Sequence, residues 1–419
     1  MTFWSTRRSR ALILSLAIGA LSLASTNYVR AEAQLLIEAS TGKVLHAENA
    51  TYPWYPASVT KLMTAYTTLR AIKEGRISLN TLFTVSRNAA AQQPTKMGFK
   101  IGTTITVDNA LKMLMVKSAN DVAVTIAEGV GGSLAGFADM MNANARRLGM
   151  TQSNFVNPNG LPAENHVTSA RDLAILARAL IREFPEYDSY WHISSIRYGN
   201  RVMRNYNSLI DRYPGADGMK TGFICASGYN VVASATRNGR RLIAVVLGSW
   251  SGAVRAQKAA QLLERGFNSG GLSWLTPSLG TVDALAPVDA QPPNLREEMC
   301  GGHRRKPPSE ENEEEPDEAT TTASGESENA QAFMLSSLKP ANGKFVLGPP
   351  VETTPPVLVF TGPADHPDPI AQTASATPKK KKKVAPKAEA AEKTAKTEKP
   401  AKTSKPAKHA KPKVTSASQ

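Results

Sequence analysis

The stretch Pro56-Ala57-Ser58-Val59-Thr60-Lys61, followed by Leu62-Met63-Thr64-Ala65-Tyr66, predicts a helix with a serine and a lysine in its first turn. Apolar residues recur there at helical spacing. Residues i and i+3 share a helix face, so the Lys61 amine can reach the Ser58 hydroxyl. A serine hydroxyl needs a neighbouring base, and a lysine can be that base only where burial or a second cation lowers its pKa. The pair predicts a serine nucleophile activated by a lysine.

Two more short motifs follow in order, Ser118-Ala119-Asn120 and Lys220-Thr221-Gly222. Each motif alone is weak, because an isolated Ser-x-x-Lys is more often a helix cap beside a solvated lysine, and Ser118 could be an ordinary helix-start cap. In this order the three resemble the active-site signature of penicillin-recognising serine acyltransferases. Lys220 could also supply the second cation for Lys61. The combination favours a catalytic site over a structural one.

Residues 1–31 have the features of a secretory signal peptide, with three arginines before the apolar stretch 11–24 and small residues before a cleavage position near Ala31. General secretion is favoured over twin-arginine export, because Arg10 stands where that signal usually has an apolar residue. The alternative is an uncleaved anchor, although the apolar stretch is short for a bilayer span. We therefore expect an exported protein of the periplasm or cell envelope.

The formal net charge of +15 is unevenly distributed. Residues 32–276 carry 26 basic and 16 acidic side chains, residues 277–377 carry 6 and 16, and residues 378–419 carry 14 lysines and 3 glutamates. A positive catalytic segment suits an anionic substrate such as a carboxylate-bearing polymer. Nucleic acid is the other usual partner of a basic protein, and the export signal disfavours it.

The cysteines and histidines do not form a framework. The two cysteines, Cys225 and Cys300, lie beside the third motif and in low-complexity sequence. We expect them not to pair, although an oxidising envelope would permit a disulfide. The six histidines occur singly and without metal-site spacing, which disfavours a zinc peptidase. We expect no metal and no cofactor.

Residues 32–276 are numerous enough for a two-lobed domain. Ser40-Thr41-Gly42 and Asn238-Gly239 each separate two apolar runs and predict hairpins. Helical patterns lie between these hairpins, at 110–116 after a cap at Asp108, at 121–127, at 133–148 before Gly149, and at 173–181 after the capping pair Ser169 and Asp172. We predict an α/β (α+β) fold, with one antiparallel sheet closed by its first and last segments, flanked by helices and a mainly helical lobe. The second motif would lie between two helices, facing the cleft.

The composition changes after residue 276. Residues 277–377 contain Pro-rich stretches and the acidic block 310–318, and residues 378–419 form a Lys-rich tail. Neither composition favours a packed core, so both segments are expected to be disordered. The tail could contact anionic lipid or cell-wall carboxylates, or it could simply keep the protein soluble.

At its motifs the sequence closely resembles the low-molecular-mass penicillin-binding proteins that act as serine-type D-alanyl-D-alanine carboxypeptidases. The resemblance covers about residues 34–275 and includes flanking runs, namely 37–45, Asn159-Gly160-Leu161, 169–172 and 228–230. It implies the penicillin-binding/serine β-lactamase-like transpeptidase fold. It also implies peptidoglycan stem peptides as substrates and β-lactams as covalent inhibitors.

The resemblance assigns the chemical steps to the first two motifs. Ser58 would attack the carbonyl between the two terminal D-alanines and form an acyl-enzyme, and Lys61 would accept the Ser58 proton. Ser118 would help pass a proton to the departing D-alanine, and Asn120 would hold the substrate amide. Water would then release the acyl group.

The resemblance assigns substrate binding to the third motif and its surroundings. Lys220 and Thr221 would bind the terminal carboxylate, and Gly222 would leave room for a strand-like substrate. The N–H groups of the nucleophile and of Phe223 would form an oxyanion hole. Arg255 resembles a position that assists carboxylate binding, and a solvated charge at a helix start is the equal alternative.

The sequence departs from the family pattern in some features, and alternative functions have to be weighed. Ala119 stands where family members often have glycine. We expect neither a β-rich second domain nor a terminal amphipathic helix, which leaves membrane anchoring open. An endopeptidase that cuts cross-links could use the same site. A class A β-lactamase is disfavoured because neither Glu183 nor Glu186 lies in a Glu-x-x-Leu-Asn pattern, and a non-catalytic cell-wall-binding protein is disfavoured by the intact motifs.

Overall fold

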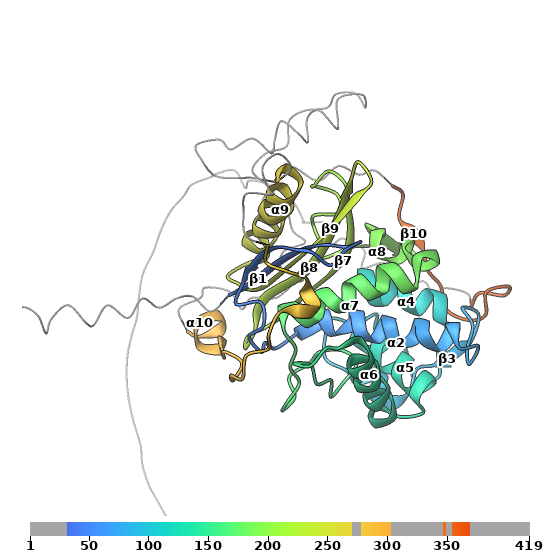
Figure 1. The fold of residues 1–419 in the computed structure, drawn as a ribbon. Helices are drawn as coiled ribbons and strands as arrows, with labels where there is room; N and C mark the ends of the chain where they lie inside the picture. Colours follow the sequence, from blue (N-terminus) through green and yellow to red (C-terminus); the bar gives the residue numbers. More distant parts are fainter. Residues whose placement is uncertain (1–31, 270–277, 303–346, 349–353, 369–419) are drawn as a thin grey trace, which may run out of the picture. The chain divides into compact units, whose positions relative to one another are not determined.

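The computed structural model describes residues 32–269, 278–302, 347–348 and 354–368 (Figure 1). The expected signal peptide, the acidic block and the Lys-rich tail lie outside the described residues. Within the described ranges, no helix combines the length and the apolar character that crossing a membrane requires.

A five-stranded antiparallel sheet has the strand order β2-β1-β9-β8-β7. Its strands are β1 (Ala33–Glu38), β2 (Val44–Glu48), β7 (Ala216–Ile224), β8 (Gly228–Arg237) and β9 (Arg240–Ser249). The first strand pairs with β9, as predicted for a sheet closed by its first and last segments. Strand β7 lies at the edge of the sheet, so one side of its backbone faces away from β8.

Both predicted hairpins are confirmed. Strands β1 and β2 are joined across Ser40-Thr41-Gly42, and β8 and β9 are joined across Asn238-Gly239. Asn238 and Gly239 have φ angles of 50° and 74°. Two consecutive positive φ values are what a two-residue type I′ turn requires, and Asn-Gly is its preferred sequence.

The longer helices cover the sheet and form the helical lobe. They are α2 (Lys61–Lys73), α4 (Val107–Val116), α5 (Asn120–Gly131), α6 (Leu134–Leu148), α7 (Ala170–Glu183) and α9 (Gly252–Asn268). Helix α9 packs on β8 and β9, whereas α7 packs on β1 and β9 from the opposite face (Figure 1). Helix α2 contacts α4, α5, α6 and α7, so it lies between the lobe and the sheet.

Two of the three predicted helix caps are confirmed. Gly149 ends α6 with φ 76°, and the Ser169 side chain accepts from Asp172 N. Ser133, the first residue of the predicted helical run, also caps α6 by accepting from Gly136 N. The cap expected at Asp108 is wrong. Thr106 caps α4, and Asp108 lies in the first turn, where it pairs with Lys112.

The remaining elements are short. They are η1 (Ala57–Thr60), β3 (Leu82–Thr84), α3 (Arg87–Ala90), β4 (Thr104–Thr106), η2 (Pro185–Tyr187), α8 (Ser189–His192), β5 (Ser195–Tyr198), β6 (Arg201–Arg204), η4 (Val282–Ala284), α10 (Arg296–Cys300) and β10 (Val357–Leu358).

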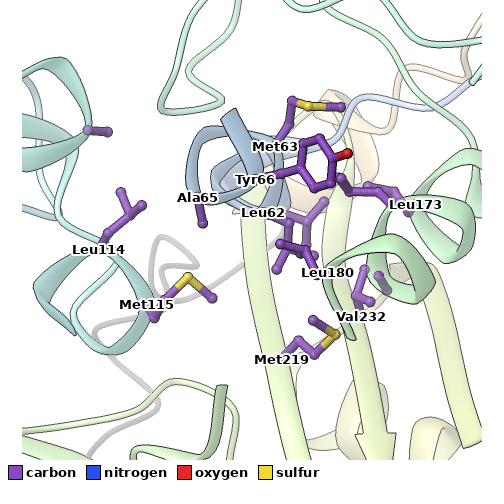
Figure 2. Close-up of a cluster of buried hydrophobic side chains, with 14 of the residues drawn as sticks. Leu62, Met63, Ala65, Tyr66, Leu114, Met115, Leu173, Leu180, Met219 and Val232 are labelled. Carbon is purple, nitrogen blue, oxygen red and sulfur yellow. The ribbon is translucent and has the colours of Figure 1, made fainter. Parts of the chain in front are cut away.

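The hydrophobic core lies directly beneath two of the predicted motifs. Figure 2 shows α2 side chains such as Leu62 and Tyr66 near Leu173 and Leu180 of α7, with Met219 of β7 close by. Leu62 follows the lysine of the first motif, and Met219 precedes the lysine of the third. Dense packing on these neighbours therefore fixes the backbone positions of both lysines.

The ordered structure continues past residue 276, so the expectation that all of 277–377 is disordered is wrong for the described part. Gly280 O accepts from Val44 N at 2.9 Å, and Val288 O accepts from Gln152 Nε2 at 3.0 Å. Val282 and Met299 are buried. A few buried apolar side chains are enough to hold this segment in place, because it docks on a surface that the sheet and α7 already provide.

The expectation that the cysteines stay unpaired is also wrong. Cys225 and Cys300 form a disulfide, with an S–S distance of 1.97 Å and a Cα–Cα distance of 5.6 Å. Leu295 N donates to Ala226 O at 3.0 Å, so the chain returns to the β7–β8 turn just before α10. The prediction failed because it placed Cys300 in a segment without a docked position.

Candidate active site

Ser58 lies in the 3₁₀ turn η1, one turn before α2 begins at Lys61. Its neighbour Ala57 has φ 51°, an uncommon conformation for a residue with a side chain. The turn is held from outside by the Asn230 amide, which donates to Tyr55 O at 3.0 Å and to Pro56 O at 3.2 Å. The sheet therefore fixes the approach to the nucleophile.

The Lys61 amine is fully buried and donates to Ser58 Oγ at 2.9 Å, Asn120 Oδ1 at 2.8 Å and Asn159 O at 2.7 Å. An ammonium has three N–H donors, which match these three acceptors. A neutral amine has two donors and one lone pair. If the two asparagine oxygens take the two donors, the lone pair is directed at the Ser58 hydroxyl, which is the geometry a general base needs.

Asn159 is a functional residue that the sequence reasoning missed. Its carbonyl accepts from Lys61, and its side chain donates to Gln92 Oε1 at 2.9 Å. The next residue, Gly160, has φ 82°, and a Cβ there would lie 1.8 Å from Ala57 O. The Asn159-Gly160-Leu161 run noted for its family resemblance was the available signal, but it did not reveal a backbone contact with the lysine.

Ser118 lies in the α4–α5 connection, as predicted, with φ 57°. It is fully buried, and among the described residues its hydroxyl has no hydrogen-bond partner. Its carbonyl accepts from Thr95 Oγ1 at 2.9 Å, and Asn120 N donates to Thr95 O at 2.8 Å. The backbone of this loop is thus held on both sides while the Ser118 hydroxyl stays available for a substrate.

The third motif lies on edge strand β7. Lys220 is almost fully buried, and its amine donates to Thr221 O at 2.9 Å. Within the described part of the chain, the buried Thr221 hydroxyl lacks a partner. A Cβ on Gly222 would lie 2.6 Å from Ser58 N. Gly222 therefore allows β7 to approach the backbone of the nucleophile, a reason beyond the room for substrate expected from the sequence.

Arg255 belongs to the first turn of α9 and is 4% exposed, so the alternative of a solvated helix-start charge is wrong. Its guanidinium donates to Asn230 O and Tyr206 O, both at 3.3 Å, and lies 5.6 Å from the Tyr229 ring centroid. The Phe223 ring packs on the same tyrosine at 4.3 Å. Both side chains thus converge on β8 beside the third motif.

A buried histidine, His166, contacts the turn η1 that carries the nucleophile. His166 Nδ1 accepts from Val156 N at 2.9 Å, which leaves Nε2–H to donate to Thr60 Oγ1 at 2.8 Å. Desolvation lowers the pKa of His166 from 6.5 to about 4. The imidazole is therefore neutral at physiological pH and joins the 157–166 loop to η1.

Glu183 has a structural role. Its carboxylate accepts from Tyr66 OH at 2.7 Å and pairs with Arg147 at 2.9 Å. The carboxylate of Glu183 therefore joins α7 to α2 and α6. These contacts account for the residue without a role in activating water, which a class A β-lactamase requires of its glutamate.

Comparison with known proteins agrees with this site. A family model described as D-alanyl-D-alanine carboxypeptidase matches residues 21–251. The chain is 36% identical over 250 residues to D-alanyl-D-alanine carboxypeptidase DacC of Escherichia coli, covering 57% of this chain and 62% of the relative. It is 37% identical over 245 residues to DacD of Salmonella typhimurium, covering 57% and 63%. The match thus spans less than two thirds of these relatives.

Solved structures confirm the predicted fold. Penicillin binding protein 6B from Escherichia coli superposes with a TM-score of 0.54 at 36% identity, covering 56% of this chain and 77% of that one. Penicillin-Binding Protein D2 from Listeria monocytogenes, in its ampicillin-bound form, gives 0.50 at 28% identity, covering 56% and 96%. The expected penicillin-binding transpeptidase architecture is therefore correct.

Proposed function

The chain belongs to the D-alanyl-D-alanine carboxypeptidase family, and on that premise we propose that it is a serine-type carboxypeptidase that removes the terminal D-alanine from peptidoglycan stem peptides. The observation that carries the proposal is the hydrogen-bonded set of Ser58, Lys61 and Asn120, with β7 in contact with the nucleophile through Gly222. A scaffold that only binds cell wall has no need for a buried lysine directed at a serine.

In the proposed reaction, neutral Lys61 takes the proton of Ser58 as Oγ attacks the carbonyl between the two D-alanines. The oxyanion is stabilised by the N–H groups of Ser58 and Phe223, a preorganised pair of donors of the kind that lowers barriers by about 3 kcal/mol. Ser118 passes a proton to the departing amine, and its buried hydroxyl has no hydrogen-bond partner among the described residues. Water then attacks the ester and the proton returns to Ser58.

Substrate binding falls to the third motif and its surroundings. The terminal carboxylate is bound by Lys220 and the hydroxyl of Thr221, which lacks a partner in the described part of the chain, and the buried Arg255 adds positive charge nearby. In the free protein, Asn120 Oδ1 accepts from Lys61 and Asn120 Nδ2 donates to Gln93 O at 2.9 Å. Nδ2 would exchange its contact with Gln93 for one with the substrate. A β-lactam would acylate the same serine, in keeping with the ampicillin-bound relative.

The place of action follows from the parts outside the described residues. We propose export to the periplasm or cell envelope by a signal peptide cleaved near Ala31, and contact of the Lys-rich tail with anionic envelope polymers. Deleting residues 378–419 should then lower the salt concentration that releases the protein from envelope fractions. Release at unchanged salt would contradict the tail contact.

The test of the activity compares wild type with Ser58→Ala and with Ser78→Ala, an exposed serine on another loop. Each protein is incubated with a peptide ending in D-Ala-D-Ala, and released D-alanine and labelling by fluorescent penicillin are measured. Release and labelling by wild type and Ser78→Ala, but not by Ser58→Ala, would support the proposal. Labelling without release, together with cleavage of a cross-linked dimer, would replace it with an endopeptidase.

A further inference from the structure

Tyr206, in the connection between β6 and β7, contacts both sides of the proposed substrate-binding site. Its hydroxyl accepts from Lys117 Nζ at 2.6 Å, and Lys117 is the residue directly before Ser118. Its carbonyl accepts from Arg255 Nη2 at 3.3 Å. One tyrosine therefore links the α4–α5 connection, which carries the second motif, to the buried arginine near the third motif.

The two asparagines beside Tyr206 attach this part of the connection to the sheet. Asn207 Nδ2 donates at 2.8 Å to the carbonyl of Gly218, a residue of β7 that lies two positions before the lysine of the third motif. Asn205 Oδ1 accepts from Asn207 N at 2.9 Å. Asn207 is almost fully buried. The backbone on either side of Tyr206 is thus held in place, and the tyrosine hydroxyl is a fixed acceptor for the lysine that reaches it from the helical lobe.

The contact between Lys117 and Tyr206 is largely shielded from water, because each residue is only 7% exposed. Burying a lysine amine is costly unless its N–H groups find acceptors, and a buried donor that loses its acceptor destabilises its surroundings. The hydrogen bond therefore constrains where the side chain of Lys117 can lie. Neither residue belongs to the three motifs, and the sequence reasoning assigned no role to either.

The conformation of Ser118 connects this contact with catalysis. Ser118 has φ 57°, which a residue with a side chain adopts only where its surroundings hold it. Thr95 Oγ1 donates to the carbonyl of Ser118, and Tyr206 anchors the residue before it. Because the buried Ser118 hydroxyl has no hydrogen-bond partner among the described residues, its direction there is set by the backbone. An anchor on the preceding side chain therefore helps to aim the hydroxyl.

We propose that Lys117 and Tyr206 are positioning residues, whose hydrogen bond aims the Ser118 hydroxyl at the nitrogen of the departing D-alanine. Neither side chain touches the substrate. The nitrogen takes the proton of Ser118 Oγ as the C–N bond breaks, and Ser118 in turn takes the proton that Lys61 accepted from Ser58. The proposal rests on the proposed carboxypeptidase function and adds to it the two side chains that hold the proton donor in place.

The test compares two substrates that differ in their need for this proton. The first is a peptide ending in D-Ala-D-Ala, and the second is the same peptide with a thioester in place of the scissile amide. An amide nitrogen departs as an amine only when it is protonated, whereas the sulfur departs as a thiolate. A side chain that serves proton delivery should therefore matter for the amide and not for the thioester. A change in substrate binding, or a general distortion of the site, should lower kcat/KM for both.

The full chain is compared with two single variants, their combination and a matched control. Tyr206→Phe removes the hydroxyl and keeps the ring and the carbonyl that Arg255 contacts. It should lower kcat/KM for the amide about tenfold and leave that for the thioester within about twofold of wild type. Lys117→Met should do the same, and the double variant should be no slower than the slower single variant, since both changes break the same hydrogen bond. Tyr190→Phe removes the hydroxyl of a similarly buried tyrosine, which donates to Asp108 at 2.7 Å, and should leave both substrates as in wild type.

Tyr206→Phe decides the outcome even where Lys117→Met does not fold. An equal loss on the amide and the thioester in Tyr206→Phe, or no loss on the amide, would overturn the positioning role while leaving the carboxypeptidase intact. No D-alanine released by wild type, with no labelling by fluorescent penicillin, would refute the proposed function itself and the positioning role with it.

Discussion

At the scale of single residues, the site depends on backbone contacts that side-chain motifs do not express. The amine of Lys61 is directed by one side-chain oxygen, from Asn120, and one main-chain oxygen, from Asn159. The motif singled out Asn120, but as a residue that holds the substrate amide and not as a partner of Lys61. The sequence could not identify the contact with Asn159, since a carbonyl contact depends on the path of the 157–166 loop and not on the side chain of Asn159.

Replacing Gly222 with alanine should abolish most activity while leaving the fold intact. The added methyl would lie 2.6 Å from Ser58 N and 2.9 Å from Val59 N, so β7 and η1 must separate. Misplacing the nucleophile by about 1 Å costs on the order of 100-fold in rate. We expect kcat/KM for D-alanine release to fall about that much. Gly302→Ala, where the methyl meets no atom of the described residues within 4 Å, is the control, and equal activity of the two variants would contradict the contact.

His166 should make the protein less stable in mild acid. Its pKa is lowered from 6.5 to about 4, so between these values the unfolded chain binds a proton that the folded protein excludes. Stability is therefore full above pH 6.5 and decreases as the pH falls toward 4, by about 2 kcal/mol between pH 7 and pH 5. Urea unfolding of wild type and His166→Gln at both pH values measures this loss. A loss of the same size in the variant would show that other groups cause it.

At the scale of elements, local signals predicted those parts whose conformation is set by a few neighbouring residues. Asn238-Gly239 fixed a hairpin because only that turn uses two positive φ values. The α4 cap failed because both Thr106 and Asp108 can cap a helix, and the choice depends on Asp108 pairing with Lys112 and Tyr190. Competition between a cap and a tertiary partner is not visible in sequence alone.

The disulfide should stabilise the catalytic unit through α10. It closes a loop between residues 75 apart in sequence, and such cross-links contribute about 2–4 kcal/mol. We expect the double variant Cys225→Ser and Cys300→Ser to unfold at lower urea concentration than wild type. Wild type in reductant should approach the variant, whereas the variant should not respond to reductant. Coinciding unfolding curves for oxidised wild type and variant would refute the stabilising role.

At the scale of the whole molecule, composition predicted the class of the fold but not the extent of the ordered part. In residues 32–276, apolar segments of helical or strand periodicity alternate with turn residues. The two lobes were therefore predictable. Residues 278–302 and 354–368 belong to the Pro-rich and acidic segment 277–377, which composition assigned to disorder. Their order comes from docking, since Val282, Met299 and Val359 are buried against elements formed by other parts of the chain.

The docked segment 354–368 offers a direct test of this extension. Val357 and Leu358 pair in parallel with β5, Phe360 N donates to Asn109 Oδ1 at 3.2 Å, and Val359 between them is fully buried while Leu358 is 49% exposed. Val359→Asp places a carboxylate in the core and should cost about 3 kcal/mol or more in unfolding free energy. Leu358→Asp makes the same change one residue away, on the solvent side, and should cost under about 1 kcal/mol. If urea unfolding shows equal stabilities for the two variants, the segment does not belong to the cooperative unit, and the ordered domain ends nearer to residue 302.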